Sequence, residues 1–133
     1  MNHHSPLRLL FLLFVLYGRA FAQALPDAPS RHKFWDRQNK TLFIVHAGLE
    51  TADFAITHHN LANGGRELNP IGRPFVESGT AGQVTFFAGR TLATLGVSYA
   101  FHRTGHHKLE RATTMFMIGD SGYGVAYSLA HHR

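Results

Sequence analysis

The stretch "HAGLETADFAITHHN", residues 46–60, decides how this chain folds, because it places polar side chains at helical spacing inside an apolar segment. With about 100° of rotation per residue, five polar side chains fall within an arc of about 80° on one side of a helix. They are His46, Glu50, Asp53, Thr57 and Asn60. The other positions are mostly Leu, Phe, Ile and Ala. The sequence therefore predicts a helix with one narrow polar stripe.

This helix is the first of three apolar segments, which cover residues 41–61, 80–101 and 112–130. Each segment is free of proline and has the length and periodicity of a helix. Residues 62–79, between the first two segments, are rich in Gly and Pro and predict a loop, with Gly64 and Gly65 ending the first helix. We therefore expect an all-α fold in which residues 41–133 form a three-helix bundle.

The N-terminal part of the chain has the pattern of a secretory signal peptide. Arg8 precedes the apolar run "LLFLLFVLY", and "RAFAQA" follows with small residues around Ala22. This pattern predicts a signal peptide over residues 1–22 that is cleaved after Ala22. The alternative, an uncleaved anchor, needs about 20 apolar residues, and the run is shorter. Residues 23–40 contain prolines, charges and no periodicity, so we expect a flexible basic leader.

The three segments are long enough to cross a bilayer, and their many small residues suit close contact between membrane helices. They predict a transmembrane bundle in the bacterial cytoplasmic (inner) membrane, with the lipid bilayer as partner and a homo-oligomer or another membrane protein as a further partner. Two observations oppose this prediction. Every segment carries an ionisable residue, and most basic residues would lie on the exported side, against the positive-inside tendency. A soluble periplasmic helical domain therefore remains the alternative.

Composition excludes some functions. The chain has 133 residues and no cysteine, so neither disulfides nor thiolate chemistry are available. The net charge is +5, and the basic residues are spread out, which gives no support for nucleic-acid binding. Eleven histidines are present; nine of them follow the expected cleavage site, and six of these nine form the pairs 58–59, 106–107 and 131–132. Such pairs at helix ends are typical of interfacial polar residues, and a weakly metal-binding surface cluster is the alternative.

The polar stripe has candidate partners on the other helices. Arg90 lies on the polar face of the second segment and Asp120 on that of the third. If these faces meet the first helix, they form a buried polar network with Glu50, Asp53 and Thr57. One guanidinium can bridge two carboxylates, and the remaining acid must then bind a proton or a cation. In a soluble protein the stripe would instead face water.

A more specific hypothesis is that this polar site binds a divalent metal ion. His46, Glu50 and Asp53 offer three ligand types on adjacent turns, as metal sites in helical bundles do. A carboxylate-rich set of this kind favours manganese or iron. The sequence contains no G-x-S-x-G, H-E-x-x-H or phosphate-binding motif, so we expect a non-enzymatic protein.

The stretch "TADFAIT", with Asp53 and Thr57, is followed by "GGRELNPIG", with Glu67, Asn69 and Pro70. This combination resembles small uncharacterised bacterial membrane proteins in which an Asp-x3-Thr helix precedes a Gly-rich turn and Glu-x-Asn-Pro. The resemblance implies a compact bundle of membrane helices and brings no established activity. The same residues also have a purely structural interpretation, in which they fix the path of the chain after the helix.

Taken together, the sequence predicts a small exported integral membrane protein of unknown role with a buried polar network. Two alternatives stay open. One is a soluble periplasmic helical binding module, and the other is a membrane protein that handles a metal ion or protons.

Overall fold

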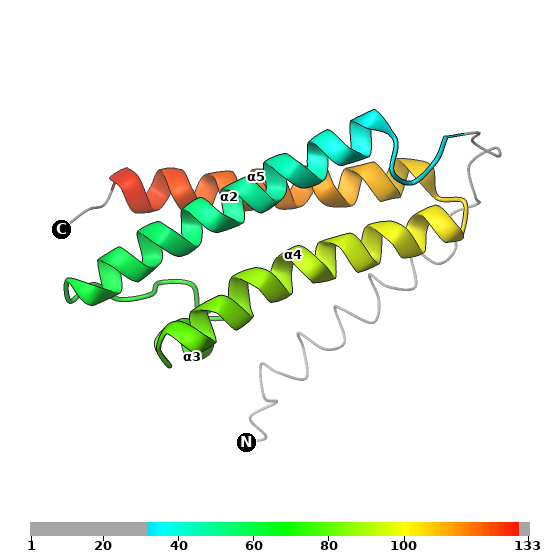
Figure 1. Cartoon of the computed structure of the whole chain (residues 1–133). Coiled ribbons are helices and arrows are strands. Elements are labelled where there is room, and N and C mark those ends of the chain that lie inside the picture. The colour runs from blue at the N-terminus through cyan, green and yellow to red at the C-terminus, as the bar shows by residue number, and fades with distance from the viewer. Residues whose placement is uncertain (1–31, 131–133) are drawn as a thin grey trace, which may run out of the picture.

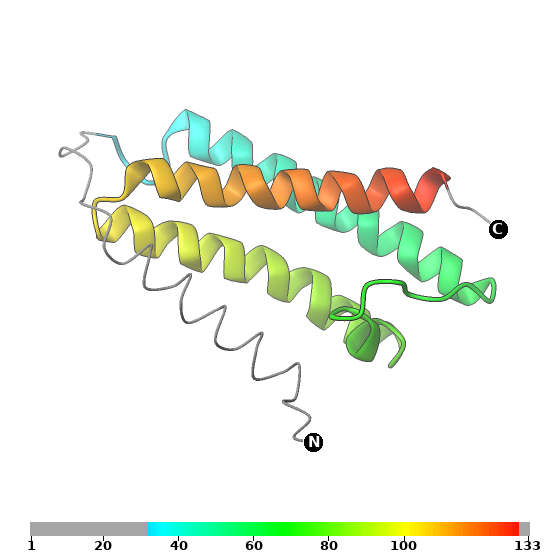
Figure 2. The ribbon, with the colours of Figure 1, turned by 180° about the vertical axis from the view of Figure 1, so that it is seen from behind.

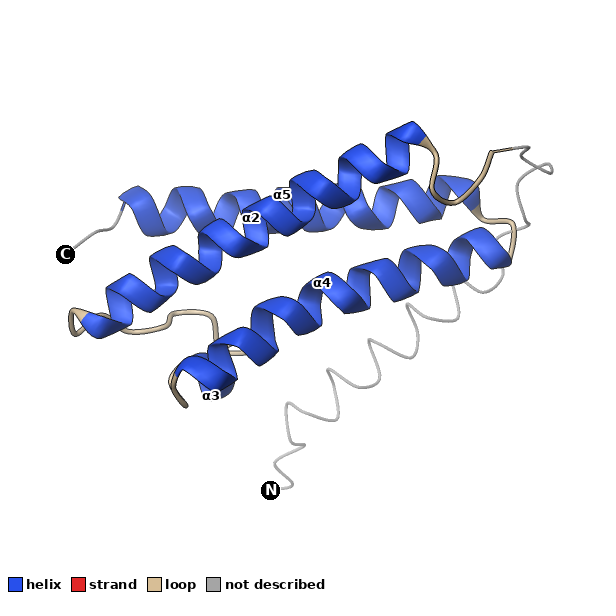
Figure 3. Cartoon of the chain, viewed as in Figure 1, coloured by secondary structure: helices blue, strands red, loops and turns tan. Residues whose placement is uncertain are grey.

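The computed structural model describes residues 32–130, and within this range the chain is helical and contains no strand (Figure 3). The elements are the long helices α2 (Arg37–Ala62), α4 (Thr80–Arg103) and α5 (His107–Ala130) and the short helix α3 (Arg73–Val76). The all-α prediction is confirmed, and α3 is an element that the sequence did not reveal. The expected signal peptide and the first part of the expected leader lie outside the described residues.

The long helices form a bundle in which each packs against the other two. Helices α2 and α5 run in the same direction and α4 runs in the opposite one (Figure 1). Seen from behind, α5 lies across α2, and α4 runs beside α5 (Figure 2). Helix α3 packs against α4 at the end of the bundle where α2 finishes. The bundle therefore has two distinct ends, one at the α4–α5 turn and one at the loop that leads to α3.

Helix α2 begins at Arg37, earlier than predicted, because Asp36 caps it. The Asp36 carboxylate accepts a hydrogen bond from the backbone N–H of Asn39 at 2.8 Å, a typical N-cap contact. Its other oxygen accepts a hydrogen bond from Arg111 on α5 at 2.7 Å. Residues 32–40, which the sequence suggested to be part of a flexible leader, are thus part of the bundle.

Glycines set the two turns that orient the helices. Gly64 has a φ of +82° and ends α2, as predicted, and the N–H of Gly65 then donates to the Asn60 carbonyl at 2.9 Å. Gly105 has a φ of +78° in the short turn between α4 and α5. Both backbone conformations favour glycine because a Cβ would be strained there.

The interior of the bundle is polar. The buried polar side chains include the stripe residues His46, Glu50, Asp53 and Thr57, together with Asn39, Gln83, Thr94, Ser98, Glu110, Thr114 and Ser121. Within residues 32–130 the buried apolar side chains are Phe34, Val76 and Phe87. Many large apolar side chains are exposed, and among them Ile44, Leu92 and Phe116 are 72%, 66% and 73% exposed. The polar stripe on α2 therefore faces the other helices and not solvent.

Across residues 32–130, none of the helices combines the length and the apolar character that are needed to cross a membrane. The ionisable and hydroxyl side chains of the stripe and of its partners interrupt the apolar runs on every long helix. The transmembrane part of the predicted fold is thus not supported by these helices.

Candidate metal centre and polar interior

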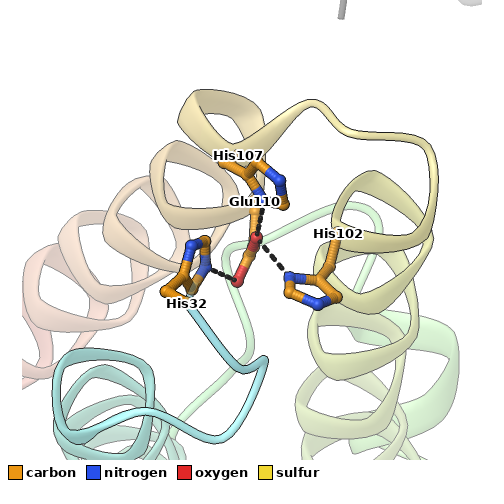
Figure 4. Close-up of side chains that lie close together, drawn as sticks. All are labelled: His32, His102, His107 and Glu110. Atoms are coloured by element: carbon orange, nitrogen blue, oxygen red, sulfur yellow. Dashed lines mark hydrogen bonds and ion pairs between the residues drawn. The ribbon is translucent and has the colours of Figure 1, made fainter. Parts of the chain in front are cut away.

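Four side chains with metal-ligand chemistry converge at the end of the bundle where α4 turns into α5 (Figure 4). His32 comes from the segment before α2 and His102 from the last turn of α4. His107 and Glu110 stand in the first turn of α5. One ligand atom from each of the four residues lies within 4.8 Å of the ligand atoms of the others.

The carboxylate of Glu110 is the centre of this group and is completely buried. His32 Nε2 lies 3.2 Å from Glu110 Oε1. On the other oxygen, Oε2, His102 Nδ1 and His107 Nδ1 lie at 2.9 and 3.0 Å. The centroids of the three imidazole rings are 4.6 to 5.2 Å apart. Three imidazoles thus surround one carboxylate.

A layer of surrounding residues holds the group in place. The Asn39 amide donates both to Glu110 Oε1 and, at 2.8 Å, to the Phe34 carbonyl. The hydroxyl of Ser98 on α4 donates to the backbone carbonyl of Glu110. The ring of Phe34 is buried, with its centroid 5.4 Å from that of His102. These contacts fix the segment that carries His32 against α4 and α5.

The electrostatics of the group favour a charged carboxylate. Burial raises the pKa of Glu110, but hydrogen bonds from His107, His102, Asn39 and His32 outweigh it and lower this pKa to about 2. Glu110 therefore carries its negative charge throughout the neutral range. A buried anion surrounded by imidazole nitrogens is an arrangement suited to hold a cation, either a metal ion or a proton.

This group differs from the metal ligands that the sequence suggested. His46, Glu50 and Asp53 share one face of α2, but seven residues of helix extend over about 10 Å, so these side chains are spread along the axis. His46 Nδ1 lies 3.9 Å from Glu50 Oε1, and His46 Nε2 lies 3.1 Å from Thr94 Oγ1. Burial lowers the pKa of His46, which favours its neutral form. Among the described residues, the convergent group is the one around Glu110.

The predicted contacts of Arg90 with the carboxylates of Glu50 and Asp120 are present in the bundle. Arg90 Nη2 lies 3.3 Å from Glu50 Oε1 and donates to the carboxylate of Asp120. The hydroxyl of Ser121 on α5 donates to the same Glu50 oxygen at 2.6 Å. One guanidinium therefore bridges carboxylates from α2 and α5, as the helical spacing indicated.

Asp53 stands one turn beyond this ion pair and faces a cavity of about 420 Å³, which Thr57 also lines. Burial raises the pKa of Asp53 to about 6, and the neighbouring charge of Glu50 acts in the same direction. The side chain of Asp53 is 8% exposed and forms no hydrogen bond or ion pair with any residue in the described range 32–130. Asp53 is thus the member of the network without a polar partner.

The loop motif, which consists of Glu67, Asn69 and Pro70, forms one wall of this cavity. The Glu67 carboxylate accepts from the N–H of Asn69 at 2.7 Å, and the Asn69 side chain accepts from the N–H of Ile71 at 2.9 Å. Arg73 Nε donates to the Glu67 carbonyl at 2.8 Å. Glu67, Asn69 and Pro70 all line the cavity. Their contacts agree with the structural interpretation of the motif, in which it fixes the path of the loop.

Sequence reasoning missed the histidine group because its members stand in three separate segments. The pair His106–His107 is evident in the sequence, but His32 lies in a stretch without periodicity, and no sequence pattern predicts its contact with α5. The spacing of His102, His107 and Glu110 across the Gly105 turn is the one local signal.

Comparison with known proteins adds no assignment. No protein-family model matches the chain, and no curated protein and no solved structure matches it. The features of this chain that indicate a function are therefore the histidine group and the cavity at Asp53.

Proposed function

We propose that this protein binds one divalent transition-metal ion, with Zn²⁺ as the best fit, through His32, His102, His107 and Glu110. One observation carries the proposal: ligand atoms from three separate parts of the chain converge within 4.8 Å at a fully buried carboxylate. Imidazole nitrogen and carboxylate oxygen are both ligands that zinc prefers.

The distances suit a tetrahedral ion. Bonds of about 2.0–2.2 Å to nitrogen and oxygen imply ligand atoms about 3.3 Å apart. The nitrogen–oxygen distances in the group, 2.9 to 3.2 Å, are close to this separation, and the whole set of ligand atoms lies within 4.8 Å. The side chains must therefore move closer together to replace the three hydrogen bonds by metal bonds. When the metal binds, each neutral imidazole coordinates it through the nitrogen that faces Glu110 and carries its proton on the other ring nitrogen.

The number of ligands indicates what the ion does. Four protein ligands close a tetrahedral site, whereas catalytic zinc keeps one position open for water. The metal would join the segment before α2 to the α4–α5 turn and so stabilise the bundle.

The test is metal binding by the purified full-length chain. We expect the chelator-treated protein to bind about one Zn²⁺ per molecule in isothermal titration calorimetry and to melt at a higher temperature once loaded. His102→Ala should lose this binding, whereas His59→Ala, which changes a histidine outside the group, should keep it. Equal binding by the two variants would show that the site is elsewhere.

A second candidate property is association with a membrane, which the distribution of side chains favours. Ile44, Leu92 and Phe116 place apolar side chains on the outside of α2, α4 and α5 while the interior is polar. Together with the expected signal peptide and the resemblance to small bacterial membrane proteins, this surface supports export to the bacterial cytoplasmic membrane. A periplasmic module free of the membrane is the alternative, and a second copy of the chain is another partner for the same surface.

Fractionation of a tagged chain expressed in a diderm bacterium separates these cases. Retention in the membrane after an alkaline carbonate wash, with a mature band shortened by the signal peptide, supports membrane association. Release by osmotic shock contradicts it. Light scattering of the released protein then shows whether it is a monomer or an oligomer.

A further inference from the structure

The cavity at Asp53 lies toward the end of the bundle opposite to the histidine group, between α2, α4, α5 and the loop 63–72. Its volume is about 420 Å³, within the range of about 300–1,000 Å³ that is usual for small-ligand pockets. One part of its wall carries carboxylates and the other is aromatic. The acidic side chains are Asp53, Glu67 and Asp120, and the aromatic ones are Phe86, Phe87, Tyr123 and Tyr127.

The charge of the wall favours a cationic ligand. Arg90 is the basic residue among the lining side chains, and it is already engaged. Its guanidinium binds Glu50 and Asp120, and its Cζ lies 5.6 Å from the centre of the Phe86 ring. Because these contacts satisfy Arg90, the wall offers an excess of negative charge and no readily available cation for an anionic ligand.

Asp53 is the group that needs a partner. It is more than nine-tenths buried, it lines the cavity, and within residues 32–130 it makes no hydrogen bond or ion pair. An unpaired buried carboxylate is costly, so it favours a bound cation or a proton. Gly124 leaves the space in front of it open, since a Cβ there would lie 3.0 Å from Asp53 Oδ2.

We propose that this cavity binds a small organic ammonium ion, with its nitrogen at the Asp53 carboxylate and its carbon body against the aromatic wall. Aromatic faces attract ammonium groups, and carboxylates supply the charge-assisted hydrogen bond. A bare metal ion needs several ligand atoms close together, and among the described residues that condition is met at the histidine group instead. The proposal is independent of the metal site.

Protons compete with the ligand for Asp53. The pKa of Asp53 is raised to about 6 by burial and by Glu50, Glu67 and Asp120, against the opposing charge of Arg90. Glu50 belongs to α2, Glu67 to the loop 63–72, Asp120 to α5 and Arg90 to α4. Each element around the cavity therefore contributes one of these charges. Affinity for an ammonium ion should therefore fall as the pH drops below about 6.

The test uses calorimetric titration of the full-length protein at about pH 7.5 with three probes: n-butylammonium, 2-phenylethylammonium and tetramethylammonium. We expect saturable binding of at least one of them. The neutral analogue of the best probe, such as 2-phenylethanol for 2-phenylethylammonium, should bind about tenfold more weakly or not at all. Mg²⁺ in place of the amine should give no signal.

Two variants test the roles of the Asp53 charge and of the space beside Gly124. Asp53→Asn removes the charge and keeps the shape, and Gly124→Ala keeps the charge and fills the space, so each should weaken binding about tenfold or more. Glu77→Gln, which changes a carboxylate outside the cavity, should bind as the unmodified protein does. Circular dichroism shows that each variant is folded before it is titrated. Absence of saturable binding for all three probes, equal binding by Asp53→Asn, or binding of Mg²⁺ alone would overturn the proposal.

Discussion

Nη2 of Arg90 lies 3.3 Å from Oε1 of Glu50, inside a bundle whose buried polar side chains are neutral or acidic. The same guanidinium binds Asp120, so that a single side chain of α4 connects α2 with α5. Ser121 completes the arrangement by donating to the Glu50 oxygen. The stability of the bundle should therefore depend strongly on this one cation.

Replacing Arg90 by Met leaves the carboxylate of Glu50 buried and unpaired. We expect the free energy of unfolding to fall by about 3 kcal/mol, as is usual when one partner of a buried ion pair is removed. Urea denaturation of both proteins measures this difference. The matched control is Arg66→Met, which removes a 3.9 Å contact with Glu77 at the surface and should cost less than about 1 kcal/mol. Equal losses for the two variants would contradict the role given to Arg90.

Replacing Asp53 by Asn should stabilise the protein at neutral pH. The pKa of Asp53 is raised from 3.8 to about 6 in the folded chain, so folding favours the protonated form. Ionised Asp53 thus destabilises the fold above about pH 6, and this penalty disappears as the pH falls toward 4. We expect a gain of roughly 1–3 kcal/mol for the variant at pH 7.5 and little difference at pH 4. Urea denaturation across this pH range, without an added amine, tests it, and a constant difference would refute the assignment.

Replacing Asn39 by Ala should weaken the metal centre without removing a ligand. Asn39 holds the Glu110 carboxylate and the Phe34 carbonyl together, which orients one ligand and the segment that carries His32. Loss of such a supporting contact typically lowers metal affinity about 10- to 100-fold. Competition with a chromophoric chelator measures the affinity. Asn63→Ala, at the exposed end of α2, should leave it unchanged, and an unaltered affinity in Asn39→Ala would mean that the contact does not orient the ligand.

Replacing Asp36 by Ala should lower the local stability of residues 32–40. The variant loses the cap of α2 and the 2.7 Å contact with Arg111, and the cap alone is usually worth about 1 kcal/mol. Amide hydrogen exchange of residues 32–40 should become faster, while that of α4 should change little. Uniform acceleration over the whole bundle would instead indicate a global loss of stability.

The sequence was most informative where the relevant residues share a helix. The spacing of the stripe residues predicted a helix with one polar side, and the positions of Arg90 and Asp120 predicted their meeting with Glu50. This worked because helical geometry fixes which side chains share a face.

Sequence reasoning was least informative where segments meet. The group around Glu110 depends on how the chain before α2 folds back onto α5, and no periodicity encodes that contact. Segment length predicted membrane-spanning helices, but the polar side chains inside each segment leave no helix of residues 32–130 apolar enough to cross a membrane.

The polar interior of the bundle has a thermodynamic consequence. Unfolding exposes apolar surface and thereby raises the heat capacity, by about 12–15 cal/mol/K per residue in ordinary globular proteins. Here many large apolar side chains are already exposed in the folded chain, and unfolding also hydrates buried hydroxyl, amide, imidazole and carboxylate groups, which lowers the heat capacity. The curve of stability against temperature should therefore be unusually flat, and cooling should weaken this fold less than it weakens one built on an apolar core.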